Sequence, residues 1–124
     1  MRIWESSLVA WADRYKIDPN LLASIMLVES GGDAEAISPT GACGLLQIQS
    51  RDRSIAKYAH YFVDRPTCRE LMNPSLNVGW GTHYLVTLYH RNGDDWREAL
   101  YRYGPIDRGY SYADLVMAHW ENAR

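Results

Sequence analysis

The segment PNLLASIMLVESGGDAEAISPTGACGLLQIQS, residues 19–50, joins an apolar helix to a long polar loop and decides the fold. Asp18 before Pro19 is typical of a helix cap followed by proline at the first helical position. LLASIMLV is apolar nearly all round, so the sequence predicts a central, buried helix. Gly31-Gly32 is typical of a helix end, and residues 31–44 are rich in Gly, Ser, Pro and small residues, which indicates a loop.

Helical patterns flank this segment on both sides. Trp4, Leu8, Trp11 and Tyr15 recur at spacings of four, three and four residues, which predicts one face of an amphipathic helix. Cap and stop signals predict more helices toward the C-terminus. These helices cover residues 74–93, 96–103 and 112–121, with a turn or two of helix in 54–62, a break at 64–68 and a single candidate extended stretch at 45–49.

Length and composition restrict the class of protein. The chain has 124 residues, which is enough for one domain and short for two. The net charge is −2, whereas nucleic-acid-binding domains of this size are usually basic. No apolar run reaches the length of a membrane span. The sequence therefore predicts one mainly α, compact domain over residues 1–124, with no nucleic-acid partner and no membrane insertion.

Cysteines and histidines give no pattern typical of a metal site. Cys43 and Cys68 could form a disulfide in an oxidising compartment or stay as two buried thiols, and their spacing leaves both states open. His83 and His90 are seven residues apart on one predicted helix, two turns from each other. We therefore expect no metal and no organic cofactor.

Residues 51–69 form the most basic stretch of the chain. Five arginine and lysine residues stand there against two aspartates, a local charge of +3. Such a stretch is usually a solvated surface, and it could also contact anionic peptides.

Glu29 is the ionisable residue whose position indicates chemistry. It ends the apolar helix, where burial and the helix dipole both disfavour a carboxylate and raise the pKa. A carboxylic acid that is protonated near neutral pH is what a general acid requires. By position alone, Glu29 also fits a solvated glutamate at a fraying helix end.

The residues around Glu29 resemble the signature of the soluble lytic transglycosylase family. That signature is a Glu-Ser pair, a short polar loop, Ser-Pro-x-Gly-Ala-x-Gly and then a Leu-x-Gln motif, and all of these stand in order in residues 29–48. NPSLNVGWGTHYLVTLY (73–89) and EALYRYGP (98–105) are similar to two further family motifs. The resemblance covers about residues 15–105 and implies a lysozyme-like fold with a substrate groove over the C-terminal end of the Glu29 helix.

The resemblance also implies roles for individual residues. Glu29 matches the catalytic glutamate, and Ser38 matches a serine that contacts the N-acetyl group of the sugar or helps the leaving group to depart. Gln47 matches a glutamine that lines the groove beside the acid, and Tyr103 matches a tyrosine whose hydroxyl approaches that acid. Gln49, at a position where the family commonly has Met or Leu, is a further candidate for substrate binding.

Three departures from the family pattern affect the details of the groove. Tyr-Asn-Ala-Gly is shortened to Tyr103-Gly104. Gln49-Ser50 replaces a common Met or Leu followed by Pro, and Cys43 stands where a small or apolar residue is usual. None of these changes removes the acid.

The activity implied is cleavage of the β-1,4 bond between N-acetylmuramic acid and N-acetylglucosamine in peptidoglycan, with Glu29 first as acid and then as base. The product would carry a 1,6-anhydromuramoyl end. A goose-type lysozyme-like hydrolase is the nearest alternative, and it would need a second carboxylate. The candidates for that carboxylate are Asp33, Glu35 and Asp52. A glycan-binding or structural protein without activity is the other alternative.

The predicted partner is the glycan strand of peptidoglycan, at the bacterial cell wall or in the periplasm. MRIWESSLVAWADRY, residues 1–15, lacks the apolar stretch of a secretory signal. The sequence therefore favours a phage lysis or virion-associated enzyme, with a component of a secretion or conjugation machine as the alternative.

Overall fold

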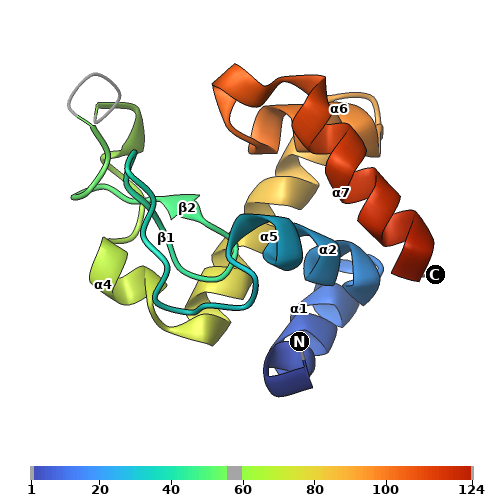
Figure 1. The fold of residues 1–124 in the computed structure, drawn as a ribbon, viewed down its shortest axis with the longest axis horizontal. Helices are drawn as coiled ribbons and strands as arrows, with labels where there is room; N and C mark the ends of the chain where they lie inside the picture. The colour runs from blue at the N-terminus through green and yellow to red at the C-terminus, as the bar shows by residue number, and fades with distance from the viewer. Residues whose placement is uncertain (1, 56–59, 124) are drawn as a thin grey trace.

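The computed structural model describes residues 2–55 and 60–123, which form a mainly α domain with a very small sheet. Figure 1 shows a helical lobe on one side and a smaller lobe, with the sheet and a short helix, on the other. This confirms the predicted fold class. The helical lobe contains α1 (Glu5–Tyr15), α2 (Pro19–Glu29), α5 (Pro74–Arg91), α6 (Trp96–Tyr103) and α7 (Tyr110–Ala123); the small lobe contains β1 (Ala42–Cys43), β2 (Ile48–Gln49) and α4 (Cys68–Leu71).

Helix α2 is the central element of the helical lobe. The Asp18 carboxylate caps it by accepting a hydrogen bond from the Asn20 amide at 2.9 Å, and Pro19 is its first residue. The helix packs against both α1 and α7. Four of its apolar side chains are fully buried, Leu21, Leu22, Ile25 and Met26, which confirms the prediction of a central, buried helix, whereas Leu27 is 45% exposed.

The other predicted helices are present with small shifts of their ends. A short 3₁₀ turn, Arg2–Trp4, precedes α1, and α7 begins two residues before its predicted start. Of the helix predicted over 54–62, His60–Phe62 form a 3₁₀ turn, Ser54 and Ile55 are not helical, and residues 56–59 lie outside the described residues. No helix among the described residues is long and apolar enough to cross a bilayer.

The small lobe is held together by a two-stranded sheet and a disulfide. Strands β1 and β2 are antiparallel, with Cys43 opposite Ile48, and β2 lies within the stretch predicted to be extended. Cys43 is bonded to Cys68 at the start of α4, which decides the open question of their pairing. The sequence prediction missed α4, although Thr67 and Glu70 form a capping box there.

Asn77 on α5 joins the two lobes. It is fully buried, and its side-chain Nδ2 donates hydrogen bonds to the carbonyls of Cys43 at 2.9 Å and Leu71 at 3.0 Å. Its Oδ1 accepts a hydrogen bond from the Leu46 amide at 2.8 Å. One side chain therefore connects α5 to β1, to the end of α4 and to the turn between the two strands.

The substitution Asn77→Ala should destabilise the protein strongly. It removes three hydrogen bonds and leaves two carbonyls and one amide buried without that partner, so we expect a loss of about 3 kcal/mol in the free energy of unfolding. Urea denaturation followed by circular dichroism measures this loss. Asn20→Ala, at an exposed position of α2, is the matched control and should change stability by less than about 0.5 kcal/mol. Equal stability of the two variants would contradict this role of Asn77.

Candidate active site

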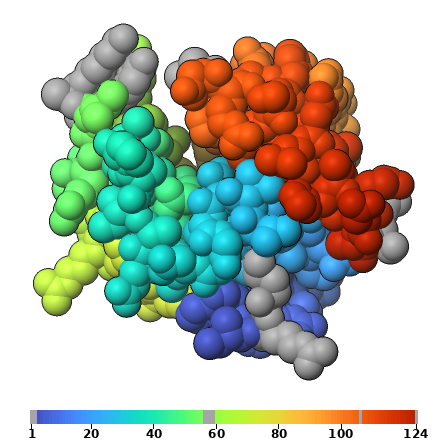
Figure 2. All heavy atoms as spheres, viewed as in Figure 1, coloured from blue at the N-terminus to red at the C-terminus, as the bar shows by residue number. Residues whose placement is uncertain are grey.

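The surface of the molecule is hollowed between its two lobes. Figure 2 shows the hollow between the green part of the small lobe and the orange part of the chain that contains α6 and α7. Glu29 is the last residue of α2, and two tyrosines from α6 and α7 lie near its carboxyl group. It contacts Tyr112 of α7 and lies within electrostatic reach of Tyr103, whose hydroxyl binds the small lobe.

Glu29 has the electrostatic environment of a general acid. Burial of the carboxyl group raises its pKa from 4.5 to about 7, while a hydrogen bond from Tyr112 and the charge of Arg108 act in the opposite direction. The Tyr112 hydroxyl donates that bond to Oε2 of Glu29 at 2.7 Å. The carboxyl group is therefore close to half protonated at neutral pH, which confirms the predicted direction of the shift.

Tyr112 is the site residue that the sequence reasoning missed. Its side chain is fully buried, and its ring packs directly on Gly104, where a Cβ atom would lie 2.2 Å from the Tyr112 ring. Any larger residue at Gly104 would displace the ring from the acid. The signal in the sequence was only a tyrosine at the start of the last predicted helix, and its 83-residue separation from Glu29 gave no sign of contact.

Tyr103 occupies the place that the family resemblance implies and makes a different hydrogen bond. Its hydroxyl donates to the Leu46 carbonyl at 2.8 Å, so the hydrogen bond to the acid comes from Tyr112. Burial raises the pKa of Tyr103 well above its usual value, and the charge of Glu29 raises it further. Tyr103 therefore remains a neutral hydrogen-bond donor that joins α6 to the small lobe beside the acid.

The turn at residues 44–47 is shaped by contacts from its own loop and from α2. Gln47 has a positive φ of 52°, and its Nε2 donates to the carbonyls of Ala36 at 3.1 Å and Gly44 at 3.0 Å. Next to Glu29, the Ser30 hydroxyl donates to the Leu45 carbonyl at 2.7 Å. The amide NH₂ of Gln47, predicted to face substrate, is thus used to hold the loop.

Ser38 and Gln49 belong to one chain of polar side chains in the small lobe. The Ser38 and Thr40 hydroxyls are 3.1 Å apart, and Nε2 of Gln49 donates to the Thr40 hydroxyl at 3.1 Å. Oε1 of Gln49 accepts a hydrogen bond from Ser54 at 3.0 Å. The structure thus brings these two predicted substrate-binding residues together through Thr40.

Of the three candidates for a second catalytic carboxylate, two accept hydrogen bonds from backbone amides and the third is exposed. Asp33 accepts a hydrogen bond from the Glu35 amide at 2.9 Å, and the Glu35 side chain is exposed. Asp52 accepts a hydrogen bond from the Cys68 amide at 2.8 Å, which joins its loop to α4. Within residues 2–55 and 60–123, no hydrogen bond joins any of the three to Glu29 or Tyr112.

The histidines lie near other side chains rather than near one another. His83 is 3.2 Å from the Tyr15 hydroxyl, and His90 is 3.0 Å from the Asp94 carboxylate. Across the part of the chain that the structure describes, no group of three or more His, Cys, Asp or Glu side chains is placed to hold a metal ion.

Comparisons with known proteins identify relatives of this arrangement. The model of the transglycosylase SLT domain family matches residues 6–108. The chain is 35% identical over 91 residues to an endo-type membrane-bound lytic murein transglycosylase A of Citrobacter koseri, which covers 73% of this chain and 43% of the relative. It is 34% identical over 89 residues to a membrane-bound lytic murein transglycosylase E of Buchnera aphidicola, covering 71% of this chain and 40% of the relative. The chain thus spans about two fifths of the length of these relatives.

The raised pKa of Glu29 predicts how stability depends on pH. The unfolded chain ionises Glu29 near pH 4.5, whereas the folded chain holds the proton up to about pH 7. The contribution of protonated Glu29 to the free energy of unfolding is therefore complete below pH 4.5 and is lost as the pH rises to 7. Between pH 4 and pH 8, the wild type should lose about 2 kcal/mol of unfolding free energy that Glu29→Gln does not lose. The loss is smaller than the full pKa shift would give, because the carboxyl group is partly exposed.

Urea denaturation at pH 4, 6 and 8 measures this difference. Glu35→Gln, an exposed glutamate in the loop after α2, is the matched control and should follow the wild-type curve. A constant difference between Glu29→Gln and the wild type at all three pH values would contradict the assigned protonation of Glu29.

Proposed function

The chain belongs to the SLT-domain transglycosylase family, and we propose from this membership that it cleaves the β-1,4 bond between N-acetylmuramic acid and N-acetylglucosamine in peptidoglycan. The names of its relatives, which are lytic murein transglycosylases, support this substrate. The single observation that carries the proposal is Glu29, with a pKa of about 7 and a hydrogen bond from Tyr112, between the two lobes.

In the first step, protonated Glu29 acts as general acid. Its proton goes to the glycosidic oxygen, and the bond between that oxygen and C1 of N-acetylmuramic acid breaks. The acetamido oxygen of the substrate stabilises the positive character that develops at C1. Glu29 becomes a carboxylate that still accepts the Tyr112 hydrogen bond and lies near the positive charge of Arg108.

In the second step, the Glu29 carboxylate acts as general base. It takes the proton of the C6 hydroxyl of the same N-acetylmuramic acid, and that oxygen attacks C1. The ring closes to a 1,6-anhydro product, Glu29 regains its proton, and no water is consumed. A pKa near 7 suits both steps, because the group gives and takes a proton at similar free-energy cost.

The geometry favours this course over hydrolysis. A hydrolase of this type uses a second carboxylate some 5–9 Å from the first to activate water. Asp33 and Asp52 accept backbone hydrogen bonds in the small lobe, as structural carboxylates do. These contacts support a mechanism with one carboxyl group, and hydrolysis remains the second candidate in the product test below.

The remaining site residues have supporting roles in this proposal. Ser38 and Gln49, joined through Thr40, supply hydroxyl and amide groups for the sugar N-acetyl groups. Gln47 and Tyr103 act mainly by holding the loop and the Leu46 turn beside Glu29. Tyr112 is a positioning residue for the acid.

We propose that the chain acts at the cell wall, in the periplasm. The disulfide between Cys43 and Cys68 supports an oxidising compartment. The names of the relatives, which refer to murein, support the same location. Association with a phage particle or with a secretion machine stays a prediction from sequence.

Digestion of purified peptidoglycan tests the reaction. The wild type should release products that are one water lighter than hydrolysis products, as measured by mass spectrometry. Glu29→Gln should reduce the rate at least about hundredfold, because it removes the only proposed acid and base. Products with ordinary reducing ends would establish the hydrolase instead. A folded wild-type protein that releases no products would refute the enzymatic proposal.

The substitution Tyr112→Phe tests how the acid is tuned. The hydrogen bond from Tyr112 lowers the pKa of Glu29, so its removal should raise that pKa above 7. Activity requires protonated Glu29, and the alkaline limb of the pH profile of kcat should therefore move to higher pH. Tyr110→Phe, the same change at an exposed position of α7, is the control and should leave the profile in place. An unchanged profile for Tyr112→Phe would show that Tyr112 does not tune the acid.

A further inference from the structure

A row of aromatic rings extends from the catalytic region along α5. The Tyr103 and Tyr84 ring centroids are 5.6 Å apart, and those of Tyr84 and Trp80 are 5.4 Å apart. Tyr84 and Trp80 are one turn apart on α5, and both are only partly buried. The row connects the surroundings of Glu29 to the part of the small lobe that contains Arg65.

Arg65 lies beside this row, close to the faces of three rings, and its charge also acts on Tyr103. Its guanidinium carbon is 4.3 Å from the Phe62 ring centroid and 4.9 Å from the centroids of both Trp80 and Tyr84. Among the ion pairs of the described residues, none includes Arg65. Stacking occupies the faces of a guanidinium and leaves the N–H donors at its edge, which match the geometry of a carboxylate.

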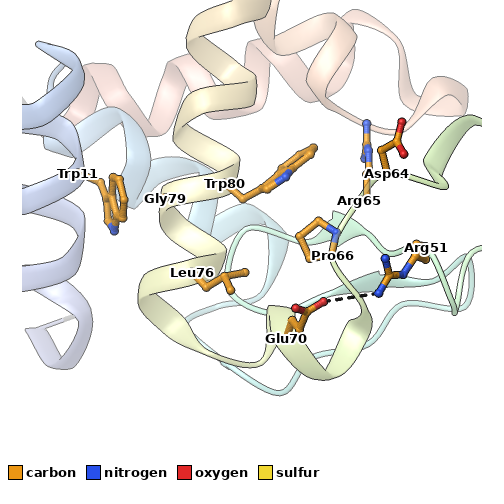
Figure 3. Close-up of a pocket in the computed structure, with 9 residues that line it drawn as sticks. All are labelled: Trp11, Arg51, Asp64, Arg65, Pro66, Glu70, Leu76, Gly79 and Trp80. Carbon is orange, nitrogen blue, oxygen red and sulfur yellow. Dashed lines mark ion pairs between the residues drawn. The ribbon is translucent and has the colours of Figure 1, made fainter.

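A cavity of about 580 Å³ lies next to Arg65. Figure 3 shows Trp80 extending from α5 toward Arg65, while Arg51 and Glu70 form an ion pair on the other side of Pro66. The volume is in the range that accommodates a small organic ligand. The lining of the cavity is aromatic and apolar on the α5 side and charged on the side of the small lobe.

Neither acidic residue of the cavity, Glu70 or Asp64, forms an ion pair with Arg65 among the described ion pairs. The Glu70 carboxylate accepts hydrogen bonds from the amide of Thr67 at 2.9 Å and from its hydroxyl at 3.1 Å, and it pairs with Arg51 at 4.0 Å. Asp64 is exposed, and its charge is the one that would compete with an incoming anion.

We propose that Arg65 is a specificity-determining residue that binds a carboxylate of the substrate, with the adjoining cavity receiving the group that carries it. The inference rests on the proposed function, since a peptidoglycan strand carries carboxylates on its peptide stems. A strand stripped of its stems carries one on the lactyl group of each N-acetylmuramic acid. Carboxylate recognition by Arg65 would let the enzyme distinguish peptidoglycan from uncharged glycans.

Kinetics of Arg65→Gln on matched substrates test this inference. One substrate is strands with intact stems, and the other is the same strands after their carboxylates are converted to amides. Loss of a charge-assisted hydrogen bond should raise KM about tenfold on the first substrate and less than about twofold on the second, with similar kcat. Arg69→Gln removes an exposed charge from the same lobe and should change neither KM more than about twofold. Asp64→Asn should lower KM on the first substrate.

The outcomes separate the possible sources of the carboxylate. An effect that requires intact stems assigns the carboxylate to the peptide. An effect that also appears on amidase-stripped strands shows that Arg65 binds the lactyl carboxylate as well, which only the stripped strands expose. An equal change on charged and amidated strands, or no change, would overturn the inference. Binding of the same strands can also be measured without cleavage, by comparing the affinity of the inactive variant Glu29→Gln with that of the double variant Glu29→Gln, Arg65→Gln. It therefore tests the inference separately from the failure of the proposed reaction.

Discussion

The hydrogen bonds of Asn77 are the constraint on which the rest of the site depends. One buried amide binds the carbonyls of Cys43 and Leu71 and the amide of Leu46, so the small lobe has a fixed position on α5. Leu46 in turn accepts the Tyr103 hydrogen bond, and its neighbour Leu45 accepts the one from Ser30, the residue after Glu29. Because buried polar groups are costly to leave unpaired, this network allows one arrangement of the two lobes.

The chemistry of Glu29 follows from that arrangement. A glutamate at the end of an isolated helix would be solvated and ionised at neutral pH. Here α7 covers α2, and burial raises the pKa to about 7, while Tyr112 and Arg108 prevent a larger shift. The two tyrosines thus have separate tasks: Tyr112 binds the acid, and Tyr103 binds the turn beside it. The shortened Tyr103-Gly104 motif fits this division, because the Tyr112 ring packs directly on Gly104.

The two lobes contribute different parts of the site. The helical lobe supplies the acid and its environment. The small lobe supplies the hydrogen-bonded side chains that run from Ser38 to Ser54, and it supplies the guanidinium of Arg65. The Cys43–Cys68 disulfide and the β1–β2 pairing hold the small lobe together, and its buried side chains belong to the same core as those of the helices. The row of rings on α5 connects both contributions, since Tyr84 contacts Tyr103 at one end and Arg65 at the other.

The sequence by itself determined the helices, most of their ends, the family and the candidate acid. These depend on neighbours in the chain: a cap acts within three residues, and an apolar face repeats every three or four. The short α4 was missed although its capping box is local, because four residues give no periodicity. Only the tertiary structure decided that Cys43 pairs with Cys68, that the Gln47 amide holds its own loop, and that Tyr112 rather than Tyr103 donates to Glu29. Tyr112 and Glu29 are 83 residues apart, and their contact depends on how α7 packs on α2, which no local pattern encodes.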